Sequence, residues 1–162
     1  MNRRVGWLEL KVPPVAAGLV LLLAMRISAY WSPPIPLPAG LSDDLGTVLV
    51  IVGALFAAAG VWQFRRFGTT VDPTRPARAS QLVDRGVFAV SRNPMYVGFV
   101  AVLLGAAFDF DALSALTGPV LLALWLHRFQ VLPEERILRE RFGPLFEDYC
   151  RRVPRWLGLP RS

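Results

Sequence analysis

The sequence predicts an all-α integral membrane protein with four transmembrane helices and a broken amphipathic helical segment at its C-terminal end. Three observations indicate this fold class. Of the 162 residues, 54% are apolar and the mean hydropathy is +0.43, which is too high for an ordinary soluble domain. The apolar residues gather in four long runs. The basic residues are confined almost entirely to alternate connections between those runs.

The four apolar runs have about the length of a membrane-spanning helix, which needs ~20 residues. They cover residues 12–31, 47–64, 94–108 and 112–132, and the third is the shortest. The alternative for the first run is a signal peptide, because Arg3, Arg4 and Lys11 precede it. Arg26 interrupts that run and no small-residue cleavage site follows it, so a membrane span is favoured.

The charge distribution predicts how the chain is oriented. The net charge is +6 and the pI is near 10.7, values that suggest nucleic-acid binding in a soluble protein. All but one of the 18 basic residues, however, precede the first run, lie between residues 65 and 92, or lie from Arg128 onward, at the end of the fourth run and after it. The two remaining connections carry four aspartates and no Lys or Arg. We therefore expect a bilayer rather than nucleic acid as partner, with both termini and the 65–92 connection cytoplasmic.

The segments between and after the runs also have predictable forms. The proline-rich connection at residues 32–38 is expected to be extended, because proline lacks an amide donor. Small residues in the second run predict close helix packing. These are Gly53, Ala54, Ala57, Ala58 and Gly60.

After the fourth run the chain becomes charged but keeps apolar residues three or four positions apart, which is typical of an amphipathic helix. Gly143 and Pro144 are expected to divide it into two short helices. Its apolar side is expected to pack on the membrane surface or on the connection before Arg92. The apolar residues concerned are Leu138, Phe142, Leu145, Phe146, Tyr149 and Val153.

The polar residues exclude some kinds of site. The single cysteine, Cys150, rules out a disulfide framework, and one histidine, His127, leaves no cluster of metal ligands, so no metal is expected. We interpret His127 as an interfacial side chain rather than a proton acceptor. Arg26 either snorkels outward past Trp31 or lines the helix bundle. No glycine-rich dinucleotide or phosphate loop occurs.

Two polar motifs lie where apolar runs meet the predicted cytoplasmic face. The first is Arg92-Asn93-Pro94-Met95-Tyr96-Val97-Gly98, and the second is the acidic pair Glu134-Glu135. An isolated arginine or acid at such a boundary usually anchors a helix at the lipid headgroups. Their occurrence together favours a small-molecule site at the membrane surface.

A longer pattern contains both motifs: Leu82-Val83-x-x-Gly86-x-Phe88-x-x-x-Arg92-Asn93-Pro94-x-Tyr96-x-Gly98, then Glu134-Glu135, Phe142-Gly143, Tyr149 and Val153-Pro154-Arg155. This pattern resembles the isoprenylcysteine carboxyl methyltransferase and phospholipid methyltransferase superfamily. The resemblance covers about residues 64–156 of a single domain, 1–162, and implies an integral membrane enzyme that binds S-adenosylmethionine. It also implies a cytoplasm-facing cofactor pocket, closed by the C-terminal segment, and a lipophilic substrate that enters from the bilayer. The implied pocket residues are Gln81, Leu82, Val83, Phe88, Asn93, Pro94, Met95, Tyr96 and Glu134.

The chemistry of S-adenosylmethionine fits these residue types. Glu134 or Glu135 suits its ammonium group or ribose hydroxyls, and Arg92 suits its carboxylate. Tyr96 and Phe88 suit the adenine ring or the sulfonium as aromatic walls. Methyl transfer is an in-line displacement that alignment and desolvation accelerate, so neither a metal nor a covalent nucleophile is required.

The expected acceptor is lipophilic and most like a prenylcysteine-type carboxylate. Three residues depart from the pattern of the carboxyl methyltransferases: Asn93 stands where His is usual, Phe88 where Tyr is usual, and Gln130 where Arg often precedes the paired acids. A phospholipid amine and a small thiol or acid are therefore alternative acceptors. A protein of another class, a non-catalytic lipid- or partner-binding protein on the same scaffold, is a further alternative. A nicotinamide-dependent reductase is disfavoured by the short chain.

Overall fold

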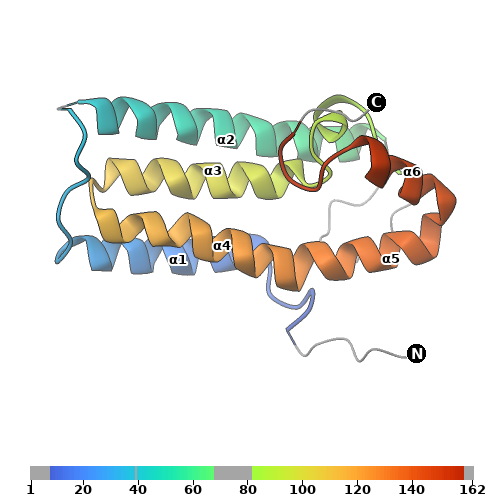
Figure 1. The fold of residues 1–162 in the computed structure, drawn as a ribbon, viewed down its shortest axis with the longest axis horizontal. Coiled ribbons are helices and arrows are strands. Elements are labelled where there is room, and N and C mark those ends of the chain that lie inside the picture. The colour runs from blue at the N-terminus through green and yellow to red at the C-terminus, as the bar shows by residue number, and fades with distance from the viewer. Residues whose placement is uncertain (1–7, 39, 68–81, 159–162) are drawn as a thin grey trace.

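The computed structural model describes residues 8–38, 40–67 and 82–158, and the regular structure within them is helical. Figure 1 shows α1 (Pro14–Ala29), α2 (Leu41–Arg66), α3 (Pro94–Asp109) and α4 (Thr117–Leu126) side by side as a bundle. The π-helix η4 (His127–Val131) joins α4 to α5 (Leu132–Phe142), which extends beyond the bundle. The chain then turns back as α6 (Pro144–Arg152). Two 3-10 helices, η2 (Gly86–Ala89) and η3 (Leu113–Leu116), precede α3 and α4.

Within the residues that the structure describes, three stretches are long and apolar enough to cross a membrane: Pro14–Trp31, Leu41–Arg66 and Leu113–Phe142. They contain the first, second and fourth predicted runs. The third run forms α3, which is apolar but has 16 residues. At 1.5 Å per residue such a helix is about 24 Å long, shorter than the ~30 Å hydrocarbon core. The structure therefore supports three of the four predicted spans, and the fourth stays a prediction.

The bundle is tightest between α2 and α3, where glycines recur every seven residues. Gly46 and Gly53 of α2 face Gly105 and Gly98 of α3. A Cβ atom on Gly53 would lie 2.8 Å from the Gly98 carbonyl oxygen, and one on Gly105 would lie 2.7 Å from the Gly46 carbonyl oxygen. The two backbones thus touch, as the small residues of the second run predicted. This contact fixes the start of α3 against the end of α2.

The π-helix η4 has a local cause. Pro133 has no amide hydrogen, so the carbonyl four residues earlier, at Phe129, receives no helical hydrogen bond from it. The Leu10 N–H donates to that carbonyl instead, at an N···O distance of 3.0 Å. Buried Gln130 extends the contact, because its Nε2 donates to the Val12 carbonyl at 2.8 Å. The segment before α1 is thereby held on the junction between α4 and α5.

The C-terminal segment folds as the sequence predicts. Gly143 has a positive φ of 50°, and Pro144 opens α6, so the helix breaks at this pair. The apolar side of α6 packs on η2 in a cluster that includes Phe88, Phe146 and Tyr149. The Tyr149 hydroxyl donates to the Phe88 carbonyl at 2.8 Å. Of the two predicted partners, the connection before Arg92 is thus the one that covers this face, and Leu145 remains exposed.

At the opposite end of the bundle, the proline-rich connection is non-helical, as expected. It is tied to the connection between α3 and α4, since the Leu113 N–H donates to the Pro33 carbonyl at 3.0 Å. Arg26 is exposed at this end, with its guanidinium 4.8 Å from the centre of the Tyr30 ring. Of the two positions considered for Arg26, the outward one is observed.

Candidate active site

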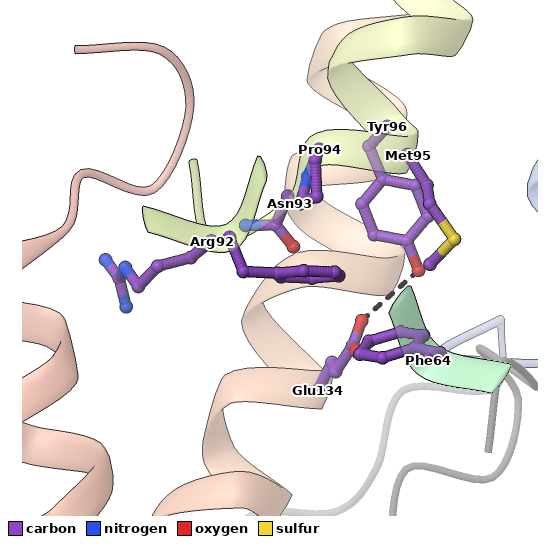
Figure 2. A pocket seen from close by; sticks show the side chains of 8 residues that line it. Phe64, Arg92, Asn93, Pro94, Met95, Tyr96 and Glu134 are labelled. Atoms are coloured by element: carbon purple, nitrogen blue, oxygen red, sulfur yellow. Dashed lines mark hydrogen bonds between the residues drawn. The ribbon is translucent and has the colours of Figure 1, made fainter. Parts of the chain in front are cut away.

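A small pocket lies where the end of α2, η2, the start of α3 and α5 meet. Its volume is about 20 Å³, enough for about one water molecule. Figure 2 shows seven of its eight lining residues with labels. The full lining consists of Phe64, Phe88, Arg92, Asn93, Pro94, Met95, Tyr96 and Glu134. Seven of these were predicted from the sequence, and they come together although they lie up to 46 positions apart.

Tyr96 and Glu134 form the polar side of the pocket. The Tyr96 hydroxyl donates to Glu134 Oε2 at 3.2 Å, and only 3% of Tyr96 is exposed (Figure 2). Within the described ranges, no Lys, Arg or His forms an ion pair with Glu134. A carboxyl group that faces a cavity without a cation beside it suits a positively charged ligand, because a buried carboxylate needs a partner.

Two stacked phenylalanines form the apolar side. The Phe64 and Phe88 rings lie 4.7 Å apart between centroids, with an angle of 29° between their planes. Phe88 was predicted, whereas Phe64 was missed. The signal for Phe64 was its position at the end of the second apolar run, where α2 meets the predicted site, but that position alone does not distinguish it from its neighbours.

Arg92 lines the pocket but directs its guanidinium away from Tyr96 and Glu134 (Figure 2). Its NH1 lies 2.8 Å from Glu135 Oε1 and also contacts the Cys150 sulfur. Its Nε is buried and has no hydrogen-bond partner among the described residues. That nitrogen is therefore a donor without a partner among the described residues, and such a donor suits an anionic group.

Glu135 accepts from two arginines and lies outside the pocket. Besides Arg92, Arg155 binds it through two nitrogens, with N···O distances of 2.9 and 2.8 Å. These hydrogen bonds raise the pKa of Arg155. Glu135 is 4% exposed, and a buried carboxylate needs a compensating charge. The two arginines provide that charge. Of the two adjacent acids considered for the ligand, Glu134 is the one that faces the pocket.

The C-terminal segment runs along the first residues of the site. The Arg92 N–H donates to the Pro154 carbonyl at 3.0 Å, and Asn93 Nδ2 donates to the Arg155 carbonyl at 2.9 Å. The Asn93 N–H donates to the Ser91 hydroxyl at 3.0 Å, a partner that sequence reasoning missed. Asn93 thus lines the pocket while its amide group is used to hold the C-terminal segment.

Two further predicted residues lie beside the pocket rather than in its wall. Leu82 and Val83 pack in the apolar cluster of η2 and α6. Gln81 lies outside the described residues. His127 faces Trp156, with ring centroids 6.5 Å apart. Among residues 8–38, 40–67 and 82–158, no three His, Cys, Asp or Glu side chains are grouped to hold a metal ion.

The amino-acid sequence of this chain is similar to those of known proteins. A family model described as phospholipid methyltransferase matches residues 43–144. Protein-S-isoprenylcysteine O-methyltransferase B of Arabidopsis thaliana is 27% identical over 120 residues, which cover 73% of this chain and 59% of that protein. A probable protein-S-isoprenylcysteine O-methyltransferase of Oryza sativa subsp. indica is 29% identical over 141 residues, covering 86% of this chain and 67% of the relative.

The chain thus spans less than two thirds of the length of the Arabidopsis relative. No solved structure matches it. The family model covers well over half of the chain, including α3 and the pocket residues from Phe64 to Glu134. The chain therefore belongs to the phospholipid methyltransferase family.

Proposed function

We propose that this integral membrane protein transfers a methyl group from S-adenosylmethionine to a lipophilic acceptor, most like a prenylcysteine-type carboxylate. The observation that carries the proposal is the Tyr96–Glu134 pair, which faces a pocket built from the residues of the family pattern. Family membership supports a methyl donor, and the printed names of the plant relatives support the acceptor.

The polar groups of the pocket match the charges of the proposed cofactor. Glu134 with Tyr96 would hold a cationic group of S-adenosylmethionine, either the ammonium or the sulfonium. The unpartnered Nε of Arg92 would donate to its carboxylate. Phe64 and Phe88 would provide the flat apolar wall that an adenine ring requires. Because the cavity volume is about 20 Å³, binding requires these walls to move apart.

In methyl transfer the bound cofactor supplies an electrophilic methyl group. The residues of this chain would bind and orient it and exclude water, and correct alignment supplies much of the acceleration. A carboxylate acceptor is already a nucleophile at neutral pH, so no residue needs to remove a proton from it. Adjacent Glu135 would keep Arg92 in place through the 2.8 Å ion pair.

We also propose that α3 is the fourth span and that the pocket, η2, α5 and α6 lie at the cytoplasmic face. α3 lies alongside α2, α4 and α1 in Figure 1 and packs against α2 through backbone contact. Apart from Arg26, the basic residues of the described ranges gather at the end of the bundle that carries the pocket. Fusing a reporter to the C-terminus tests the orientation: activity on the outer side of the membrane contradicts it.

A phospholipid amine is the second candidate acceptor, because the matching family model is that of the phospholipid methyltransferases. An amine must lose a proton before it attacks, so its methylation requires a base and rises with pH. His127, stacked on Trp156, is the histidine available for that task. A carboxylate acceptor predicts no such requirement.

Two measurements test the proposal. Calorimetry of the purified protein with S-adenosylhomocysteine should give a dissociation constant, and absence of binding would favour the non-catalytic alternative. Transfer of a radiolabelled methyl group is then compared for a farnesylcysteine analogue and for phosphatidylethanolamine in vesicles. Methylation of the farnesylcysteine analogue alone supports the carboxylate acceptor, whereas methylation of phosphatidylethanolamine alone replaces it.

A further inference from the structure

A second hollow, separate from the cofactor pocket, lies between α1 and α4. It is an apolar groove of about 540 Å³, within the range of small-molecule sites. Its walls include Ala16, Val20 and Leu21 of α1 and Leu121 and Trp125 of α4, and Val12 lies at one end. The groove and the cofactor pocket share no lining residue.

The groove faces outward from the bundle. Val20 is 69% exposed and Leu121 is 51% exposed, although both are apolar. In a membrane-spanning segment such residues face lipid chains rather than water. From Pro14 to Leu21 the α1 wall rises about 10 Å at 1.5 Å per residue, and Val12 lies two residues before the helix, so the groove is roughly half as long as the ~30 Å hydrocarbon core. This length corresponds to one leaflet.

A charged cluster adjoins the groove at the Val12 end. Glu9 Oε1 lies 2.7 Å from Arg128 NH1, and Glu9 Oε2 lies 2.7 Å from Arg136 NH2. The cluster is joined to the groove through ring contacts, because the Arg128 guanidinium lies over Phe129 and Phe129 packs against Trp125. The hydrogen bond from Gln130 to the Val12 carbonyl provides a second connection.

The cluster carries an excess of positive charge at an accessible position. Two arginines share one carboxylate, and the Glu9 side chain is 5% exposed whereas those of Arg128 and Arg136 are 54% and 38% exposed. The acid is thus buried beneath two guanidinium groups that remain open to solvent or headgroups. Such a surface attracts an anion, and Arg is well suited to bind phosphate with two parallel hydrogen bonds.

The geometry points to a binding site for one anionic phospholipid, with an acyl chain in the α1–α4 groove and its phosphate at Arg128 and Arg136. The apolar walls match the chain, the length matches one leaflet, and the excess charge matches the headgroup. The lipid would hold α1 and the segment before it against α4, at the junction that Leu10 already caps. This role is independent of methyl transfer.

The test compares dioleoylphosphatidylglycerol with dioleoylphosphatidylcholine, which carry the same acyl chains. Native mass spectrometry of the full chain with an equimolar mixture should show retention of the anionic lipid, with a preference of roughly fivefold for each arginine engaged. Thermal stability should rise more with phosphatidylglycerol than with phosphatidylcholine. Equal retention of the two lipids by the unmodified protein would overturn the proposal.

Matched variants separate the headgroup from the groove. Arg128→Gln should lower the preference for the anionic lipid roughly fivefold, whereas Arg152→Gln should not change it, although the two side chains are equally exposed at 54% and each pairs with one acid. Ala16→Phe should fill the groove and displace the lipid, whereas Ala54→Phe, on the exposed face of α2, should not. The assignment is contradicted if Arg152→Gln reduces the lipid preference as much as Arg128→Gln does. It is also contradicted if Ala54→Phe displaces as much lipid as Ala16→Phe does.

A further readout distinguishes this site from the acceptor's path. Binding of S-adenosylhomocysteine should be unchanged in all four variants, because none of these residues lines the cofactor pocket. If Ala16→Phe instead keeps the phospholipid and raises the Michaelis constant of a lipophilic acceptor, the groove belongs to the acceptor and the proposal is wrong.

Discussion

Two adjacent acids at the start of α5 face two different regions of the molecule. Glu134 faces the pocket and has the Tyr96 hydroxyl as its hydrogen-bond donor, whereas Glu135 faces the cluster of Arg92 and Arg155. Consecutive residues of a helix point about 100° apart, so one turn can serve both regions. The acid that is fully paired within the protein supports the fold. The acid that has no ion pair within the described part of the chain is available to a ligand.

The largest expected effect comes from Glu135→Gln. The substitution leaves the guanidinium groups of Arg92 and Arg155 without their shared negative charge and should destabilise the protein by about 3 kcal/mol, as for other disrupted buried ion pairs. Thermal unfolding in detergent measures it, with exposed Glu140→Gln of the same helix as the control. If both variants unfold at the same temperature, Glu135 has no structural role and the contrast with Glu134 fails.

Glu134→Gln, in contrast, should weaken ligand binding and leave the stability of the protein almost unchanged. It keeps the size of the side chain and removes the charge, so binding of S-adenosylhomocysteine should weaken by roughly 1–3 kcal/mol. Thermal stability should hardly change, since no ion pair is broken. Calorimetry and thermal unfolding of one preparation decide the matter: unchanged binding with lowered stability would make Glu134 a structural anchor.

A smaller effect is expected for Tyr96→Phe, which removes the hydroxyl that donates to Glu134 and keeps the ring in the core. Loss of this hydrogen bond should weaken cofactor binding by about 0.5–1.5 kcal/mol. The effect should be the same for every acceptor, and exposed Tyr30→Phe should have none. A change in acceptor preference at constant cofactor affinity would instead place Tyr96 in the acceptor site.

The smallest effect concerns Cys150, which contacts Arg92 in the Glu135 cluster. Burial raises the pKa of its thiol above the ordinary value of a cysteine, although Arg92 acts in the other direction. Because the folded protein disfavours the thiolate, stability is retained below the unfolded pKa of about 8.5 and is lost as the pH rises above it. Between about pH 8 and pH 10, the unfolding temperature should therefore fall less steeply with pH for Cys150→Ser than for the unmodified chain. If the unfolding temperatures of the two proteins fall in parallel, ionisation of the thiol does not contribute to the pH dependence of stability.

Much of this architecture could be predicted from the sequence, because it depends on local chemistry. Apolar runs of spanning length specify the long helices, and the prolines at positions 94 and 144 specify where two helices begin. Glycines seven residues apart provide two flat faces that can touch. The resemblance to the family selected six of the eight pocket residues, and the chemistry of S-adenosylmethionine added Arg92.

Other features were decided only by the tertiary structure, because they depend on which distant groups meet. The choice between Glu134 and Glu135 follows from the rotation of α5 against α3 and the C-terminal segment, and pattern alone does not give that rotation. Phe64 enters the pocket only because α2 is fixed against the start of α3. The Phe129 carbonyl is freed by Pro133 in the sequence itself, but its partner, Leu10, lies more than a hundred positions away. Local composition sets which groups need partners, and packing determines which partners they find.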